Sequence, residues 1–526
     1  MESSTTGANG LYGSPSFGEL IAEALDRYPE RDAFRADGVA TTYRALAQRI
    51  SRACQMYEAI GLDAGDGLAV LAGNAVDTYA LLAAGYISGL RVVTLHTRGG
   101  EADHAFILSD SEARVLIVEP DFEERAVSLR RTCPQVEHWL SSGPSRFLED
   151  FWASASRFQP QSLLPRGDDD TIVRLAYTGG TTGRPKGVVI TNRTIRTQSL
   201  TLLSATCFAD PPRYLCALPI THGAGGLITA ILIRGGCVVL KKRFEPETFI
   251  EAIVGERCNA TWMVPTTIYA LLDHPRTREV DWSGLRTLVY SGAPMAPARI
   301  REALDVFGPC LIQMYGQAEA PAHVLLMTQD EHAHASAEQL AAAGKPFPGV
   351  RVALLDDDNQ PVAPGEPGEI CVRGPLVMAG YWKQPELTEA AFAGGWLHTG
   401  DIARQDRDGY YYIVDRKKDM LISGGFNVYP REVEDVLARH ASVSQVAVIG
   451  TPDSKWGEVV TAYIVLRKDS DADVRELMEM VRAEKGEIHV PRLIHFVDDL
   501  PLTSVGKVDK KALRALASST EANRSS

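Results

Sequence analysis

The sequence lacks an excess of positive charge. Of its 526 residues, 54 are Lys or Arg and 67 are Asp or Glu, so the formal net charge is −13. Proteins that bind nucleic acid through bulk charge are usually basic, and we therefore expect no nucleic-acid partner. Net charge says little about a single cleft, so these numbers still allow a local basic cluster around a small anion.

The sequence also lacks a long apolar run. The most apolar stretch, Ala80 to Val93, is interrupted by Ser88 and Arg91, whereas a membrane-spanning helix needs about 20 mostly apolar residues. The first residues, Met1 to Leu20, are rich in Ser, Thr and Gly and lack the apolar centre of a secretory signal. We expect no transmembrane segment and a cytoplasmic location.

Several chemical signatures are missing as well. The eight cysteines form no Cys-x-x-Cys pair, which is typical of free thiols in a reducing compartment. There is no Rossmann Gly-x-Gly-x-x-Gly fingerprint, no Walker A loop and no Ser/His/Asp or Cys/His signature. His332 and His334 lie too close together for a known zinc signature and are expected on a polar helix. With 45% hydrophobic residues the chain can bury a sizeable core and is globular.

The first third of the chain alternates strand and helix patterns. Short apolar runs at Gly67–Gly73, Arg91–Leu95 and Arg114–Val118 predict buried strands, and Ala75–Ser88 and Glu101–Leu108 predict helices between them. This alternation predicts a mainly parallel sheet with helices on both faces.

The pattern of predicted strands and helices changes towards the C-terminus. A second alternating region, 171–330, is followed at 350–412 by short β-rich runs with Gly and Pro between them, which predict a small antiparallel subdomain. After the basic run at 415–419 a new pattern of helices and strands begins. An amphipathic helix at Arg431–His440 then begins a compact α/β module of about 110 residues, a size that can fold alone.

One glycine-rich segment points to chemistry. It follows a predicted strand at Thr171–Tyr177, and it combines glycines that allow close backbone approach with hydroxyl donors and one cation. These are the parts needed to hold a polyphosphate. The residues are Thr178, Gly179, Gly180, Thr181, Thr182, Gly183 and Lys186.

This segment resembles the phosphate-binding signature of class I adenylate-forming enzymes, which include acyl-CoA synthetases, firefly-luciferase-like ligases and nonribosomal-peptide adenylation domains. The resemblance covers nearly the whole chain, because further motifs of that family recur in order. They are Leu218-Pro-Ile-Thr-His222, Ser291-Gly-Ala-Pro294, Tyr315-Gly-Gln-Ala-Glu319, His398-Thr-Gly-Asp401, Asp415-Arg-Lys-Lys-Asp419, Ser423-Gly-Gly-Phe-Asn427 and Pro501-Leu-Thr-Ser-Val-Gly-Lys507.

The resemblance implies an α/β fold in two parts. A large multi-lobed N-terminal domain, residues 1–416, would hold two mainly parallel sheets flanked by helices and the small β subdomain. A mobile small α/β C-terminal domain, residues 417–526, would act as a lid, with a hinge near Lys418 that absorbs the backbone rotation.

The resemblance also implies roles around the adenosine of ATP. Asp401, expected in a tight turn after Gly400, would accept hydrogen bonds from the ribose hydroxyls, and Arg416 would contact the ribose or a phosphate. Tyr315, followed by Gly316, would stack on the adenine. The loop on the other side of the base would be formed by Gly292, Ala293 and Pro294.

For the metal, the resemblance implies Glu319 and Thr178. Mg²⁺ prefers carboxylate, water and phosphate oxygens. The sequence departs from the family pattern just before Glu319, where the usual Thr is Ala318. One donor to the reacting phosphate is therefore missing, and loss of such a donor can cost roughly 3 kcal/mol of transition-state stabilisation. Gln317 or a water could replace it.

Three further positions follow from the resemblance. Lys507 would bridge the substrate carboxylate and the α-phosphate during adenylation. His222 would border the acyl pocket. Gly424 and Gly425 would border the tunnel for the pantetheine arm of CoA.

The implied activity is ATP- and Mg²⁺-dependent activation of a carboxylic acid to acyl-AMP, followed by transfer of the acyl group to CoA. Transfer to an amine by a stand-alone amide bond synthetase and loading of a carrier protein remain open, because all three share the adenylation site. A non-catalytic nucleotide-binding protein is a further alternative. The expected partners are a carboxylic acid, ATP and CoA or an amine, and the chain could be a monomer or a homodimer.

Overall fold

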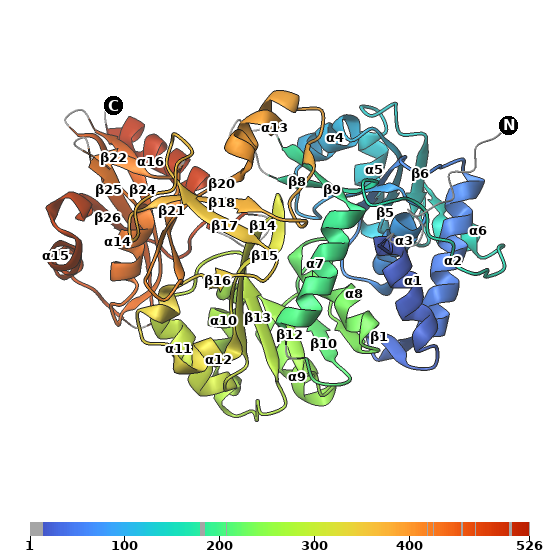
Figure 1. The fold of residues 1–526 in the computed structure, drawn as a ribbon, viewed down its shortest axis with the longest axis horizontal. Helices are drawn as coiled ribbons and strands as arrows, with labels where there is room; N and C mark the ends of the chain where they lie inside the picture. The colour runs from blue at the N-terminus through green and yellow to red at the C-terminus, as the bar shows by residue number, and fades with distance from the viewer. Residues whose placement is uncertain are drawn as a thin grey trace.

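The structure is a computed structural model. It describes residues 14–178, 185–206, 208–417, 419–423, 426–453, 456–468, 470–503 and 508–524. Figure 1 shows a large body formed by the N-terminal and central parts of the chain, with a smaller C-terminal domain at one end. Among the described residues, no helix is both long and apolar enough to cross a bilayer.

The first large sheet has eight strands and confirms the predicted parallel arrangement. In spatial order they are β19 (Gly380–Tyr381), β9 (Lys186–Thr191), β8 (Ile172–Thr178), β4 (Arg91–Thr94), β3 (Gly67–Leu71), β5 (Ala113–Val118), β6 (His138–Ser141) and β7 (Glu149–Asp150). The strands from β8 to β7 are parallel, whereas β8–β9 and β9–β19 are antiparallel. Strand β3 is apolar throughout because Leu68 and Val70 enter one core while Ala69 and Leu71 enter another on the opposite face.

The second large sheet has nine strands. In spatial order they are β16 (Lys345–Pro346), β15 (Ala320–Met327), β14 (Leu311–Gln317), β13 (Thr287–Ser291), β12 (Ala260–Met263), β10 (Arg213–Cys216), β11 (Cys237–Leu240), β1 (Asp32–Ala36) and β2 (Val39–Thr42). Strands β14 to β1 run parallel, and the edge pairs are antiparallel.

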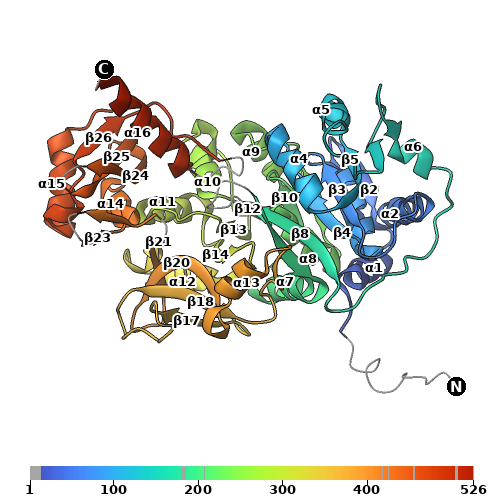
Figure 2. The same cartoon turned by 90° about the horizontal axis from the view of Figure 1, so that it is seen from above.

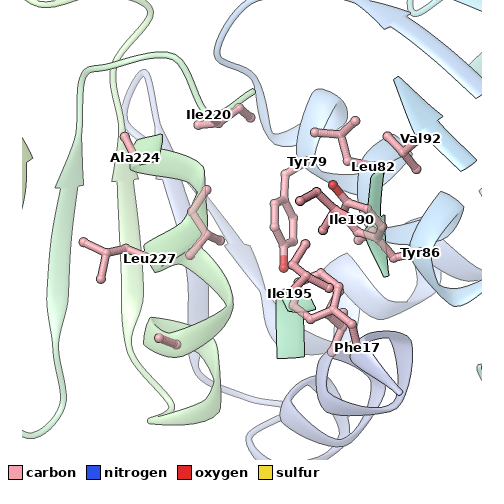
Figure 3. Close-up of a cluster of buried hydrophobic side chains, with 14 of the residues drawn as sticks. Phe17, Tyr79, Leu82, Tyr86, Val92, Ile190, Ile195, Ile220, Ala224 and Leu227 are labelled. Carbon is pink, nitrogen blue, oxygen red and sulfur yellow. The ribbon is translucent and has the colours of Figure 1, made fainter. Parts of the chain in front are cut away.

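The main hydrophobic core lies between these two sheets (Figure 3). It is filled by α1 (Phe17–Arg27), α3 (Val76–Ile87), α7 (Asn192–Ala205) and α8 (Gly226–Ile233), where the rings of Phe17 and Tyr86 meet edge to face with centroids 5.1 Å apart. Ser16 caps the N-terminus of α1, where its hydroxyl accepts a hydrogen bond from the Glu19 amide in a capping box. The other helices of the large body are α2 (Tyr43–Ala59), α4 (Glu101–Asp110), α5 (Glu123–Leu129), α6 (Phe151–Ala155), α9 (Pro246–Gly255), α10 (Pro265–Leu272), α11 (Pro297–Phe307), α12 (Gln329–His334) and α13 (Pro385–Ala391).

The predicted antiparallel subdomain is confirmed. Its sheet runs β17 (Arg351–Leu355), β18 (Gly368–Arg373), β20 (Leu397–Gln405) and β21 (Tyr411–Arg416). The expected tight turn at Asp401 is wrong, because β20 continues through it. Gly400 has φ +73° and lies where the β18–β20 register shifts, so the strand bulges at this glycine and then resumes.

The small C-terminal domain has its own core. It contains β22 (Leu421–Ser423), β23 (Phe426–Val428), α14 (Pro430–Leu437), β24 (Val443–Asp453), β25 (Gly457–Leu466), α15 (Val474–Lys485), β26 (Leu493–Phe496) and α16 (Lys510–Arg524). The apolar face predicted for the first helix packs inward through Val433, Val436 and Leu437, and the helix ends at Leu437. Figure 2 shows this domain beside the large body, and the Arg431 amide of α14 donates to Asp415 Oδ2 on β21 of the β subdomain at 2.9 Å. The boundary at 416/417 remains a prediction, and the predicted hinge at Lys418 lies outside the described residues.

Candidate functional site

Three distant segments bring a cation, a phenol and a carboxylate together. Lys186 begins β9, Glu319 lies in the turn between β14 and β15, and Tyr381 ends β19. The Lys186 ammonium donates to the Tyr381 hydroxyl at 2.6 Å, and that hydroxyl donates to Glu319 Oε1 at 2.9 Å. Lys186 Nζ and Glu319 Oε1 are 3.5 Å apart. Sequence reasoning selected the lysine and the glutamate, and it missed the tyrosine between them.

The glycine-rich segment joins two antiparallel strands. Thr178 is the last residue of β8 and pairs with Lys186 on β9, so the phosphate-binding loop predicted between them is the connection of a hairpin. The Thr178 hydroxyl oxygen is buried and has no hydrogen-bond partner among the described residues. A buried hydroxyl without a partner fits a site completed by a ligand oxygen or by the loop itself. The predicted loop residues Gly179, Gly180, Thr181, Thr182 and Gly183 lie outside the described residues.

A second carboxylate is held by a phenol and a guanidinium. The Tyr315 hydroxyl donates to Asp401 Oδ2 at 2.6 Å, and Arg416 Nε lies 3.1 Å from Asp401 Oδ1. Asp401 is buried, whereas Arg416 is about half exposed. Burial, reinforced by the Asp401 charge, raises the pKa of Tyr315 well above its usual range, so the phenol remains a donor. These three residues, predicted separately, form one cluster.

The loop predicted to line the adenine follows β13. Gly292 has φ +85°, a conformation that favours glycine, and the loop leaves the sheet at the carboxyl end of this strand. Strand β14 lies parallel beside it, with Ser291 opposite Met314, and it ends in Tyr315, Gly316 and Gln317. The carboxyl ends of neighbouring parallel strands are where open α/β sheets bind ligands. The other loop residues are Ala293, half-buried, and Pro294, exposed.

His222 is held by two neighbouring side chains. Its Nδ1 is 2.9 Å from the Thr221 hydroxyl oxygen, and its ring meets that of His96 edge to face at 4.8 Å between centroids. Burial, with His96 and Arg174 nearby, lowers the pKa of His222 to about 3, so the imidazole is neutral. His96 was missed by sequence reasoning, although its place just after β4 marks the carboxyl end of a parallel strand.

Glu369 contacts residues on either side of the Asp401 and Arg416 pair. Its Oε1 accepts from the Gly400 amide at 2.8 Å, and its Oε2 lies 3.4 Å from Lys417 Nζ. His398 Nδ1 is 3.2 Å from the same Oε2. Nothing in the sequence around Glu369 marks this role, because the contacts come from two other strands.

Ala318 is the residue that stands where the family pattern has Thr. Its methyl group packs against the main core, and the neighbouring Gln317 amide donates to the Thr399 carbonyl at 3.3 Å. Gln317 is thus engaged with the β subdomain in this structure. The predicted residues Lys507, Gly424 and Gly425 lie outside the described residues.

The donor set fits magnesium held with a nucleotide. The described residues contain no group of three or more His, Cys, Asp or Glu side chains that could hold a metal alone. Mg²⁺ usually binds through one or two carboxylates together with substrate phosphates and water. Glu319 and the Thr178 hydroxyl, which has no partner among the described residues, would supply oxygens of this kind beside Lys186.

Two protein-family models match the chain. Residues 21–382 match the model described as AMP-binding enzyme, and residues 432–507 match the AMP-binding enzyme C-terminal domain.

Curated relatives match over nearly the whole chain. A medium/long-chain-fatty-acid–CoA ligase, FadD8 of Mycobacterium tuberculosis, is 41% identical over 513 residues, which cover 95% of this chain and 89% of the relative. A feruloyl-CoA synthase of Amycolatopsis sp is 39% identical over 490 residues, covering 92% and 96%.

A solved structure supports the same fold. The amide bond synthetase McbA from Marinactinospora thermotolerans has a TM-score of 0.88 and 33% identity, covering 95% of this chain and 99% of that one. The two family models, the relatives and the arrangement of domains agree: the chain belongs to the AMP-binding enzymes, the class I adenylate-forming superfamily.

Proposed function

We propose that the protein is an AMP-forming carboxylate–CoA ligase. The observation that carries the proposal is the pair of charged clusters in one large domain. Lys186 and Glu319 meet beside the glycine-rich hairpin, while Asp401 and Arg416 meet at the edge of the β subdomain. The first cluster suits a magnesium triphosphate and the second suits a ribose, and the whole-chain similarity to acyl-CoA ligases supports this assignment.

In the first half-reaction a carboxylate oxygen attacks the α-phosphorus of ATP, and pyrophosphate leaves with the electron pair of the broken bond. Asp401 accepts hydrogen bonds from the ribose, and Lys186 holds the phosphates. Lys507 stabilises the charge that develops at the α-phosphate. Glu319 and Thr178 would hold magnesium, which would supply positive charge to offset that of the phosphates. Because these groups position and stabilise rather than attack, no enzyme nucleophile is required.

In the second half-reaction the small domain turns about its predicted hinge. Lys507 is withdrawn, and Gly424 and Gly425 border the path of the incoming thiol. The CoA sulfur attacks the acyl carbonyl, the carbon–oxygen bond to AMP breaks, and the thiol proton is released. His222, neutral beside the acyl group, contributes shape and a polar edge without adding charge.

A panel of carboxylic acids tests this proposal. Each acid is incubated with MgATP, first with CoA and then with amines, while pyrophosphate release and product masses are followed. We expect acid-dependent pyrophosphate release, a thioester with CoA, and loss of both in Lys507→Ala. No pyrophosphate release with any acid would contradict the ligase proposal.

A second candidate activity is amide bond formation. The observation that favours it is the similarity over 95% of this chain to the amide bond synthetase McbA. An amide product in the absence of CoA, with no thioester in its presence, would establish this alternative.

A further inference from the structure

Tyr381 is fixed by the backbone on both sides. Strand β19 pairs with β9, with Tyr381 opposite Val188, and the Trp382 amide donates to the Gly187 carbonyl at 2.8 Å. A few residues earlier, the Met378 amide donates to the Glu319 carbonyl at 2.8 Å. The same short segment is therefore bonded to the strand that begins with Lys186 and to the turn that carries Glu319.

The phenol stands between two opposite charges. Lys186 Nζ is 2.6 Å from the hydroxyl oxygen and 4.0 Å from the centroid of the Tyr381 ring, so the ammonium contacts the ring face as well as the hydroxyl. The hydroxyl in turn donates to Glu319 Oε1 at 2.9 Å. Every one of these contacts to the glutamate uses Oε1.

Lys186 Nζ and Glu319 Oε1 already lie 3.5 Å apart, and the hydroxyl that bridges them holds the pair at that separation. Glu319 is 7% exposed, so its carboxylate has little water to replace a lost donor. The flexible lysine side chain would then move closer to Oε1 and pair with it. A closed ion pair of this kind competes with phosphate for the lysine and with a cation for the carboxylate.

We propose that Tyr381 is a positioning residue for MgATP. Its hydroxyl bridges Lys186 and Glu319, keeps the pair from closing further and fixes Oε1, so that the ammonium stays available to phosphate and Oε2 stays available to magnesium. The inference rests on the proposed adenylation function, because it assigns the phosphates and the metal to this cluster.

The variant Tyr381→Phe removes one oxygen and keeps the ring. Calorimetric titration with ATP, with and without Mg²⁺, measures binding apart from turnover. We expect Mg²⁺ to strengthen ATP binding less in the variant than in the wild type, by about tenfold or more, the effect of one hydrogen bond to a charged group. In pyrophosphate release the KM for MgATP should rise, while the KM for the carboxylic acid stays unchanged.

Tyr412→Phe is the matched control. The Tyr412 hydroxyl also donates to a carboxylate, Asp406, at 2.8 Å, but in the hairpin of the β subdomain. This variant should bind MgATP like the wild type. Equal effects in the two variants, or unchanged magnesium dependence in Tyr381→Phe, would overturn the proposal.

A double-mutant cycle separates spacing from a general structural effect. In a Lys186→Met background no ammonium remains to collapse onto Glu319, so Tyr381→Phe should add little further loss of MgATP binding. Full additivity would overturn the spacing role. A wild type that binds MgATP but releases no pyrophosphate with any acid would contradict the proposed function instead, and the binding cycle would still decide the role of Tyr381.

Discussion

Asp401 shows how a single carboxylate is oriented by neighbours from different parts of the chain. Tyr315 reaches it from the end of β14 and Arg416 from the end of β21, one at each oxygen. With each oxygen already directed by one partner, the carboxylate presents its remaining lone pairs in a fixed geometry. Two adjacent hydroxyls of a ribose could use that geometry.

The substitution Asp401→Asn keeps the shape of the side chain and removes its charge. We expect kcat/KM for ATP in pyrophosphate release to fall by about tenfold or more, because hydrogen bonds to a charged acceptor are lost and Arg416 loses its partner. Asp408→Asn, which removes an exposed charge from the β20–β21 turn, is the control. Similar kinetics in the two variants would argue against Asp401 as a ribose ligand.

His323 is a buried histidine that sequence reasoning did not select. It lies on β15, is fully buried, and has neither ring nitrogen hydrogen-bonded to a described residue. Burial lowers its pKa to about 3, below the value near 6.5 expected in an unfolded chain. The unfolded chain therefore binds the proton more readily, and stability that is complete above about pH 6.5 is lost as the pH falls towards 3.

The variant His323→Leu should remove this contribution. Between pH 7.5 and pH 4.5 its free energy of unfolding in urea should fall less than that of the wild type, because leucine does not titrate. The difference is at most about 1.4 kcal/mol for each pH unit below the pKa of the unfolded histidine. His334→Leu, at a site whose side chain is 78% exposed, should follow the wild type. An identical pH dependence in His323→Leu and the wild type would refute this assignment.

At the scale of elements, the loop from 220 to 225 depends on one close approach. A Cβ placed on Gly225 would lie 1.8 Å from the Ile220 carbonyl oxygen, closer than any side chain can come. The Gly225 amide also donates to the His222 carbonyl at 3.0 Å. The loop that positions His222 can therefore fold this tightly only with glycine at 225.

We expect Gly225→Ala to lower the free energy of unfolding by about 1–3 kcal/mol, because the backbone must shift to admit the methyl group. The same variant should raise the KM for the acid more than that for ATP, since His222 moves with the loop. In Gly284→Ala the new methyl group meets no atom within 4 Å, so both properties should stay as in the wild type. A Gly225→Ala protein with unchanged stability would show that the loop can relax freely.

The elements also show what could be predicted from the sequence. Apolar runs such as the one in β3 and the amphipathic face of α14 were predicted correctly, because burial leaves a local pattern. The glycine-rich segment selected Lys186, and the resemblance to the adenylate-forming family selected Glu319 and Asp401. Tyr381 and Glu369 were missed because their contacts come from segments distant in sequence, and the turn predicted at Asp401 was wrong because Gly400 bends a strand that continues.

At the scale of the whole molecule, the small domain and the large body have separate hydrophobic cores, so we expect them to unfold in separate transitions. The core that contains Leu437 and Val433 is built only from residues of the small domain, whereas the large sheets share cores of their own. Domains with independent cores and a modest interface need not unfold together. We therefore expect scanning calorimetry to show more than one transition.

Leu437→Ala identifies the transition of the small domain. The side chain is fully buried, and its truncation should cost about 2–5 kcal/mol in that transition alone. Leu516→Ala, at a side chain that is 53% exposed in the same domain, is the control. A single two-state transition that shifts as a whole in Leu437→Ala would show that the two domains unfold as one unit.

The last rung between β20 and β21 joins Asp401 to Arg416, and the next backbone bond runs from the Lys417 amide to the Gly400 carbonyl at 2.8 Å. The predicted hinge near Lys418 thus comes shortly after Arg416, the strand partner of Asp401, and these are the two residues proposed to bind the ribose. Any nucleotide that prefers one angle of the small domain must, by thermodynamic reciprocity, be bound more tightly when that angle is imposed. A covalent crosslink that holds the small domain in one orientation would then change the affinity for AMP and the affinity for ATP by different factors. The ratio of those factors would measure how strongly nucleotide binding and the orientation of the small domain are coupled.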